Sequence, residues 1–147
     1  MITTVVTPVQ ERTCYVLDAC ALIAYLNDEP GAEIVEELLM LARTSQVELY
    51  LAAVNAYELY YDCLKRDPPT AQQLLNDVYT LPLTIMDCLE RSAMLNAGDF
   101  KVTYRVSLAD SIVLGLAKQL NAQVVSSDHR EFDPIDRDGN VRFKWIR

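Results

Sequence analysis

Short uninterrupted runs of hydrophobic residues alternate along this chain with longer stretches in which hydrophobic residues recur every three or four positions. The first pattern is typical of buried β-strands and the second of amphipathic helices. Strands are predicted over 14–17, 47–51, 83–86 and 123–126, and residues 141–146 are a candidate for a last strand. Strands separated by helices predict an α/β fold, a three-layer α/β/α sandwich with a central, mostly parallel sheet of four to five strands.

Capping residues and helix breakers mark the ends of the predicted helices. Helices are expected over roughly 19–26, 32–44, 54–66, 70–79, 87–97 and 107–120. Asp87 to Glu90 and Ser107 to Asp110 each match a capping box at a helix start, and Gly98 is the expected terminator of the helix before it. Asp133 and Asp136 are expected to lie in a loop.

Four acidic residues lie beside apolar stretches, where burial makes a charge costly: Asp18, Glu58, Asp110 and Asp128. In open α/β sheets, functional sites lie beyond the carboxyl ends of the strands. Asp18 and Asp128 directly follow predicted strands, and Glu58 and Asp110 lie in first turns of helices, so all four are expected to face one crevice. At about 5 Å and an effective dielectric of about 20, two carboxylates repel by roughly 3 kcal/mol. The cluster therefore predicts a divalent cation with oxygen ligands, for which Mg²⁺ or Mn²⁺ is the best fit.

Each acid also has a simpler structural explanation when it is taken alone. Asp18 suits a helix N-cap, and Asp110 suits the last position of its capping box. Glu58 lies three residues after Asn55 and suits a similar cap or a solvated face, and Asp128 suits a loop. The metal interpretation therefore depends on the four acids meeting in one place.

Composition and charge narrow the class of protein. The 147 residues, 51% hydrophobic and 23% charged, suit one soluble domain over 14–147, preceded by a short extension over 1–13. The net charge of −8 argues against a broad electrostatic grip on nucleic acid, but not against a small site where metal ions supply the positive charge. Four cysteines without a CxxC pair, beside one histidine, argue against a zinc site and suit a reducing cytoplasm. No apolar run approaches the roughly 20 residues that cross a bilayer, so no membrane partner is expected.

Four segments, in order and at suitable spacing, resemble the motifs of PIN-domain proteins. They are Tyr15 to Gly31, the surroundings of Asn55 and Glu58, Ser107 to Ser111, and Val124 to Phe132. The resemblance covers about residues 14–145 and points to the stand-alone VapC-type toxins of toxin–antitoxin pairs. It implies a PIN-like fold, a Mg²⁺- or Mn²⁺-dependent endoribonuclease, a homodimer, and a small antitoxin partner that usually also binds DNA.

Carried over by position, the four acids correspond to the acidic cluster of that family. Asp18 and Asp110 are expected to bind the ion directly, Asp128 directly or through water, and Glu58 to orient the attacking water or hold a second ion. Hydrolysis of RNA would then leave a 5′-phosphate and a 3′-hydroxyl, as the resemblance implies. Ser126 is expected to fix a water or a carboxylate behind these ligands.

Two residues depart from the family pattern without removing a carboxylate. Cys20 stands where a serine is common, and Ser126 where a threonine is common. Serine keeps the hydroxyl group of threonine. The thiol is expected to lose a good hydrogen bond and to weaken the ordering around Asp18.

Other functions remain open at this point. A phosphatase or a nuclease acting on another nucleic acid would use the same cluster, and a catalytically silent PIN-fold module would act only by binding a protein. With His129 as the single histidine, metal-free catalysis by two histidines is excluded, and no G-x-S-x-G motif or glycine-rich phosphate loop is present.

Two further groups of residues have weaker functional interpretations. Tyr57, Tyr60, Tyr61 and Leu64 share helical spacing and are expected in the core or at a dimer surface. A locally basic C-terminal end, expected to be solvated or to guide RNA, is formed by Arg130, Arg137, Arg142, Lys144 and Arg147.

Overall fold

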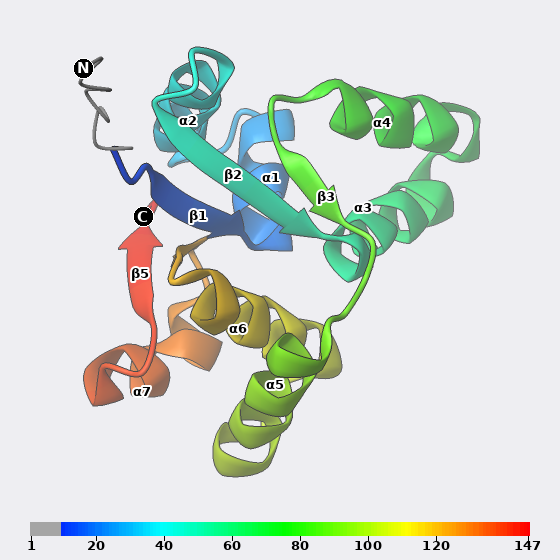
Figure 1. The fold of residues 1–147 in the computed structure, drawn as a ribbon. Coiled ribbons are helices and arrows are strands. Elements are labelled where there is room, and N and C mark those ends of the chain that lie inside the picture. Colours follow the sequence, from blue (N-terminus) through cyan, green and yellow to red (C-terminus); the bar gives the residue numbers. More distant parts are fainter. Residues whose placement is uncertain (1–9) are drawn as a thin grey trace, which may run out of the picture.

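A computed structural model describes residues 10–147; residues 1–9, most of the expected N-terminal extension, lie outside the described residues. Seven helices and five strands follow one another within this range (Figure 1). In chain order they are β1 Thr13–Leu17, α1 Ala19–Leu26, α2 Ala32–Arg43, β2 Val47–Ala52, α3 Ala53–Arg66, α4 Pro68–Thr80, β3 Thr84–Met86, α5 Arg91–Tyr104, α6 Leu108–Leu120, β4 Gln123–Ser126, α7 His129–Asp138 and β5 Arg142–Trp145. None of the helices within residues 10–147 is both long and apolar enough to cross a membrane.

The five strands form one sheet in the order β3-β2-β1-β4-β5, and every neighbouring pair is parallel. The chain begins in the middle of the sheet, moves outward to β3, and returns to lay β4 on the other side of β1. The strand order therefore reverses between β1 and β4, which is the place where α/β sheets open a site. Leu17 lies opposite Val125 in the register, and the Asp18 amide donates to the Val125 carbonyl at 3.0 Å. The carboxyl ends of β1 and β4 are thus level with each other.

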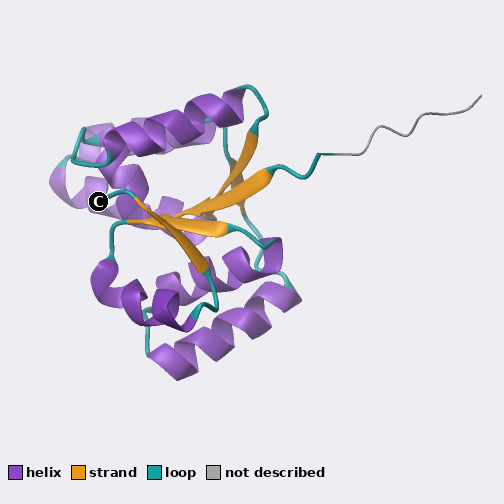
Figure 2. Cartoon of the chain, turned by 90° about the vertical axis from the view of Figure 1, so that its left-hand side faces the viewer, coloured by secondary structure: helices purple, strands orange, loops and turns teal. Residues whose placement is uncertain are grey.

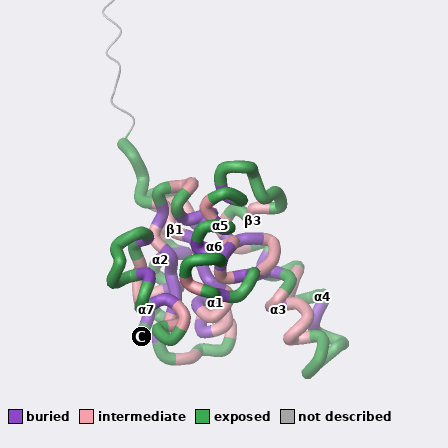
Figure 3. The backbone as a smooth tube through the Cα atoms, turned by 90° about the horizontal axis from the view of Figure 1, so that it is seen from below, coloured by how far each residue is buried: buried purple, intermediate pink, exposed green. Residues whose placement is uncertain are grey.

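Side chains that alternate along the strands fill two separate cores, one on each face of the sheet. Leu17 and Val125 pack with residues of α1 to α4, whereas Val16 and Val124 pack with residues of α5 to α7. Figure 2 shows the strands between these two helical layers. Exposed positions dominate α4 and the far end of α3, which extend away from the buried centre (Figure 3). The predicted α/β/α sandwich is confirmed, with a sheet that is fully parallel.

Helix α5 differs from its prediction at both ends. It begins at Arg91 instead of Asp87, and it continues through Gly98 to Tyr104. Gly98 is exposed, and a Cβ atom added there would meet nothing within 4 Å. A solvent-facing glycine costs a helix only about 1 kcal/mol, and burial of Phe100 two residues later favours continuation. The prediction that Gly98 ends the helix was therefore wrong.

Helix α7 occupies the segment that was expected to be a loop. The Asp128 carboxylate caps its first turn by accepting from the Glu131 amide at 3.2 Å. Phe132 and Ile135, three residues apart, are both 0% exposed and anchor the helix to the sheet. Pro134 and the surrounding charged residues obscured this short apolar pattern in the sequence.

Candidate functional site

Asp18 occupies the turn between β1 and α1 and is only 4% exposed. Its Oδ1 accepts from the Ala19 amide at 2.8 Å, and its Oδ2 accepts from the Ser126 hydroxyl at 3.0 Å. Burial raises the pKa of Asp18, these hydrogen bonds oppose the rise, and the negative charge of Asp128 adds to it. Asp18 therefore caps a helix, and its buried negative charge is energetically unfavourable.

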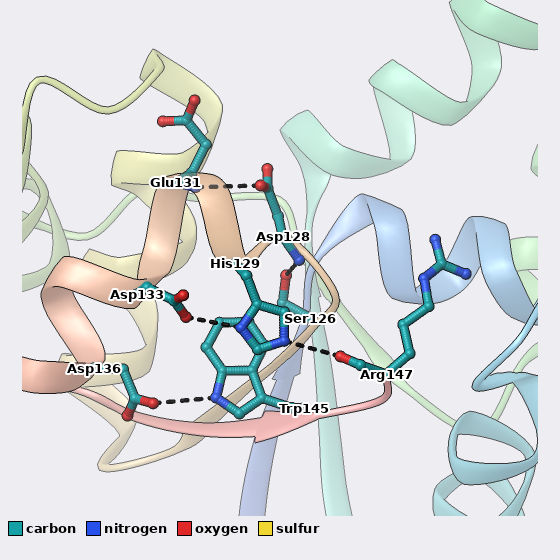
Figure 4. Close-up of polar contacts among 8 residues, drawn as sticks. All are labelled: Ser126, Asp128, His129, Glu131, Asp133, Asp136, Trp145 and Arg147. Atoms are coloured by element: carbon teal, nitrogen blue, oxygen red, sulfur yellow. Dashed lines mark hydrogen bonds and ion pairs between the residues drawn. The ribbon is translucent and has the colours of Figure 1, made fainter.

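Ser126, at the end of β4, connects two of the predicted site residues. Its hydroxyl is fully buried, donates to Asp18 and accepts from the Asp128 amide at 3.0 Å. Figure 4 shows Ser126 beneath Asp128, on the strand that leads into α7. The serine thus holds the Asp18 side chain and the main chain at Asp128 in fixed relation.

Cys20 makes more contacts than the sequence suggested. Its Sγ lies 3.1 Å from Asp18 Oδ2 and 3.2 Å from Ser126 Oγ, and it accepts from the Ser127 amide at 3.4 Å. Burial, followed by the Asp18 charge, raises the pKa of Cys20 to about 11. The thiol is therefore protonated at neutral pH and serves as a hydrogen-bond donor, so the expected loss of that bond was wrong.

Glu58 is held by its neighbour one turn earlier on α3. Asn55 is fully buried, and its Nδ2 donates to Glu58 Oε2 at 3.0 Å, while its Oδ1 is buried without a hydrogen-bond partner. The pair does not cap the helix, because the N-cap is Ala52. Burial raises the pKa of Glu58, and the Asp18 charge raises it further.

Asp110, in the first turn of α6, has a strongly raised pKa. Burial raises its pKa to about 7, and the charges of Asp18, Asp128 and Glu131 contribute to the rise. Its backbone amide donates to Ser107 Oγ at 3.1 Å, which is the predicted capping arrangement. The four predicted acids are thus close enough to perturb one another through Asp18.

Glu131 is a fifth acid near this cluster that sequence reasoning left out. It lies on the first turn of α7, and its charge helps to raise the pKa of Asp110. Its spacing of three residues from Asp128 was the available signal, which has meaning only once residues 129–138 are known to be helical. Asp133 and Asp136 instead form hydrogen bonds with His129 and Trp145 (Figure 4).

The donor set fits a hard divalent cation. Carboxylate oxygens are the ligands that Mg²⁺ and Mn²⁺ prefer, and a cation would offset both the burial and the mutual repulsion that raise these pKa values. The unpartnered Oδ1 of Asn55, beside Glu58, is one more oxygen that a water or a cation would satisfy. Within residues 10–147, no three histidine, cysteine, aspartate or glutamate side chains are grouped closely enough to hold an ion as they stand. An ion held here would therefore take part of its coordination from water, or these side chains would have to rotate toward one another.

The tyrosine group of α3 is only partly buried. Tyr57 is 62% exposed, which excludes it from the core and leaves the dimer surface as the prediction for it. Tyr60 and Tyr61 are half-buried, and Leu64 is 40% exposed.

Solved structures with this fold include several toxin–antitoxin complexes. VapBC2 of Rickettsia felis, bound to a promoter DNA fragment, has a TM-score of 0.72 and 19% identity over 90% of this chain and 98% of its own. DNA-bound VapBC of Salmonella typhimurium has a TM-score of 0.70 and 18% identity over 92% and 99%. VapBC-1 of nontypeable Haemophilus influenzae has a TM-score of 0.69 and 18% identity over 91% and 98%. At these identities the likeness establishes the fold alone.

Among curated proteins, no sequence matches this chain. The family model described as PIN domain matches residues 15–138, which include every acid of the candidate site. The chain therefore belongs to the PIN-domain family.

Proposed function

We propose that this protein is a metal-dependent endoribonuclease that acts as the toxin of a toxin–antitoxin pair. The observation that carries the proposal is the group of acids at the carboxyl end of β1, where burial, and then the Asp18 charge, raise the pKa of both Glu58 and Asp110. Acids perturbed by burial and by one another at a strand-order reversal are a mark of a functional site.

Each residue of the site has a distinct role that follows from its position. Asp18 and Asp110 bind the cation, and Asp128 binds it directly or through water. Glu58, held through one oxygen by Asn55, orients a water with the other or holds a second ion. Ser126 and Cys20 keep the Asp18 carboxylate in place from behind. When bound, Mg²⁺ or Mn²⁺ would supply Lewis acidity that activates water and offsets the charge on the phosphodiester.

The partners belong to the same proposal. The three neighbours described above are VapBC assemblies, and two of them are bound to DNA. We infer by likeness of fold that this chain binds a small antitoxin protein, forms a homodimer, cleaves RNA and works in the cytoplasm. The domain over 14–147 would then carry all of the catalytic residues itself.

The decisive experiment compares RNA cleavage by Asp18→Asn with cleavage by the unaltered protein. Purified protein, freed of any partner, is incubated with structured and unstructured RNA in Mg²⁺, in Mn²⁺ and in EDTA. Because even the partners behind a metal ligand are worth about 10–100-fold, loss of a direct ligand is expected to cost more than about 100-fold. Asn has nearly the shape of Asp, so circular dichroism should show an unchanged fold.

A matched control is Asp99→Asn, which removes the same charge at an exposed position on α5. It should cleave as the unaltered protein does. Full activity in Asp18→Asn would contradict the role of Asp18. Absence of cleavage in every metal, from folded protein, would favour instead a catalytically silent module that acts by binding its partner.

A further inference from the structure

Four aromatic rings form a continuous column from the core to the surface beside Asp128. Phe132 is fully buried on α7, and its ring centroid lies 5.3 Å from that of Phe143 on β5. The Phe143 and Trp145 rings are 5.0 Å apart and within 9° of parallel. The His129 ring closes the column at 3.8 Å from Trp145, with 19° between the planes.

The two outer rings are fixed by hydrogen bonds at their edges, as Figure 4 shows. His129 Nδ1 lies 2.7 Å from Asp133 Oδ1, and Nε2 lies 2.9 Å from the Arg147 carbonyl oxygen. Trp145 Nε1 donates to Asp136 Oδ2 at 3.1 Å. A ring held at both nitrogens and on one face has little freedom to lose when a ligand binds.

The outer face of His129 is open. The side chain is 46% exposed although Trp145 covers one face and both nitrogens are engaged, so the exposed area lies chiefly on the opposite face. Within residues 10–147, Trp145 is the only ring that stacks on it. The column therefore ends in a flat, locked surface where one further ring would fit.

The residues around His129 favour a nucleobase as the ring that stacks on its open face. His129 directly follows Asp128, and consecutive Cα atoms are only about 3.8 Å apart. Residues 129–147 carry five arginines and lysines against four acids, whereas the whole chain has a net charge of −8. The column thus lies in a segment without the acidic excess of the whole chain, and it is next to Asp128, one of the acids that would meet a phosphate.

We propose that the exposed face of His129 stacks on a nucleobase of the substrate and thereby positions the adjoining phosphate at the acidic cluster. This inference rests on the proposed nuclease function and adds a substrate-binding residue to it. Stacking on an aromatic face tolerates every base, so the contact anchors a single strand without selecting its sequence.

The test uses the fact that His129 is the only histidine of the chain, so a protein without a histidine tag gives one set of imidazole NMR signals. Single-stranded RNA is added to Asp18→Asn protein in Mg²⁺, where cleavage is not expected. Ring currents of a stacked base should move the imidazole carbon-bound proton signals upfield. Inorganic polyphosphate, which carries the charge without bases, should leave them in place.

Binding affinity provides the second measurement. His129→Ala should weaken RNA binding by about 5- to 150-fold, the loss of one stacked base, whereas His129→Phe keeps a ring and should retain most of the affinity. Tyr79→Ala removes a ring that is 57% exposed on α4 and should change nothing. Thermal unfolding of each variant separates lost binding from a lost fold.

Three outcomes would overturn the proposal: equal NMR shifts with polyphosphate, undiminished RNA binding by folded His129→Ala, or RNA cleavage that His129→Ala leaves unchanged. The proposed function is tested separately by cleavage. Stacking without cleavage would reject the nuclease function and keep the nucleobase site. Cleavage that is unaffected by His129→Ala would keep the nuclease function and reject the nucleobase site.

Discussion

A carboxylate buried as deeply as Asp18 depends on its hydrogen-bond donors. A backbone amide, the Ser126 hydroxyl and the Cys20 thiol all point to it, yet burial still raises its pKa. Hydrogen bonds that favour the charged form lower a carboxyl pKa, so each donor offsets part of the cost of burial. Of the three donors the Cys20 thiol lowers the pKa of Asp18 the most, so it matters for the pH at which Asp18 becomes a ligand.

Removing that donor should move the pH dependence of cleavage. In Cys20→Ala the Asp18 carboxylate loses a partner, its pKa rises further, and a higher pH is needed to ionise it. We expect the acidic limb of the pH–rate profile to shift to higher pH, and Cys20→Ser, which keeps a donor, to return it to or below its original position. Cys88→Ala, an exposed thiol, is the control. Identical profiles for Cys20→Ala and the unaltered protein would show that the thiol does not tune Asp18.

The acids themselves could be predicted at this scale, because a charged residue beside an apolar run is visible in the sequence. The unpartnered oxygen of Asn55 could not, since it depends on how deeply α3 packs against the sheet. The contacts of Cys20 were equally out of reach, because the Ser126 hydroxyl and Ser127 amide that it meets lie more than a hundred positions along the chain.

Two glycines show how helix packing shapes the layer of α5 and α6. A Cβ atom on Gly115 would lie 2.5 Å from the Ala93 carbonyl oxygen and 2.7 Å from the Ala97 Cβ, so α6 approaches α5 more closely than any side chain allows. Gly98, on α5 itself, faces open space. The same residue type is thus required at one position and dispensable at the other.

Alanine at the two positions should have opposite effects on the free energy of unfolding. Gly115→Ala forces the helices apart and should lower it by about 1–3 kcal/mol, as overpacking does. Gly98→Ala removes backbone freedom from the unfolded chain and should raise it by about 0.5–1 kcal/mol. Urea unfolding measures both. A destabilised Gly98→Ala would mean that α5 does not run through this position.

Helices were predicted well where apolar spacing was long and badly where it was short. The pattern of α6 spans the whole helix, and its predicted limits hold to about one residue. In α7 only Phe132 and Ile135 are buried, and Pro134 between them is an ordinary signal for a loop. The tertiary contact of these two side chains with the sheet decides the conformation, and no local rule contains it.

At the scale of the whole molecule, the acidic cluster joins both helical layers at the end of the sheet. Asp18 and Glu58 belong to the side of α1 and α3, whereas Asp110 belongs to α6 on the other. Repulsion among them therefore opposes the assembly of the entire fold. Loss of this repulsion, by protonation or by a cation, should stabilise the molecule as a unit.

Stability in EDTA should accordingly fall as pH rises. The pKa of Asp110 rises from 3.8 to about 7 on folding, so the folded state binds more protons between these values and its advantage is lost toward pH 7. The melting temperature should be lower at pH 7.5 than at pH 5, and Mg²⁺ should restore part of it at pH 7.5.

Asp110→Asn isolates this contribution. The variant should melt above the unaltered protein at pH 7.5 in EDTA, and the difference should vanish near pH 4. Glu37→Gln, an exposed acid on α2, should give a constant difference instead. A melting temperature of Asp110→Asn that tracks the unaltered protein at every pH would rule out repulsion at this residue.

The distribution of these acids along the chain also governs when the site can exist during synthesis. Asp18 leaves the ribosome early, but β4 and Asp128 follow roughly 110 residues later, which takes about 5–20 s at usual elongation rates. Because β4 pairs directly with β1, no shorter nascent chain can place the two acids together. For the function proposed above, a messenger being translated is therefore not exposed to the activity of its own unfinished product.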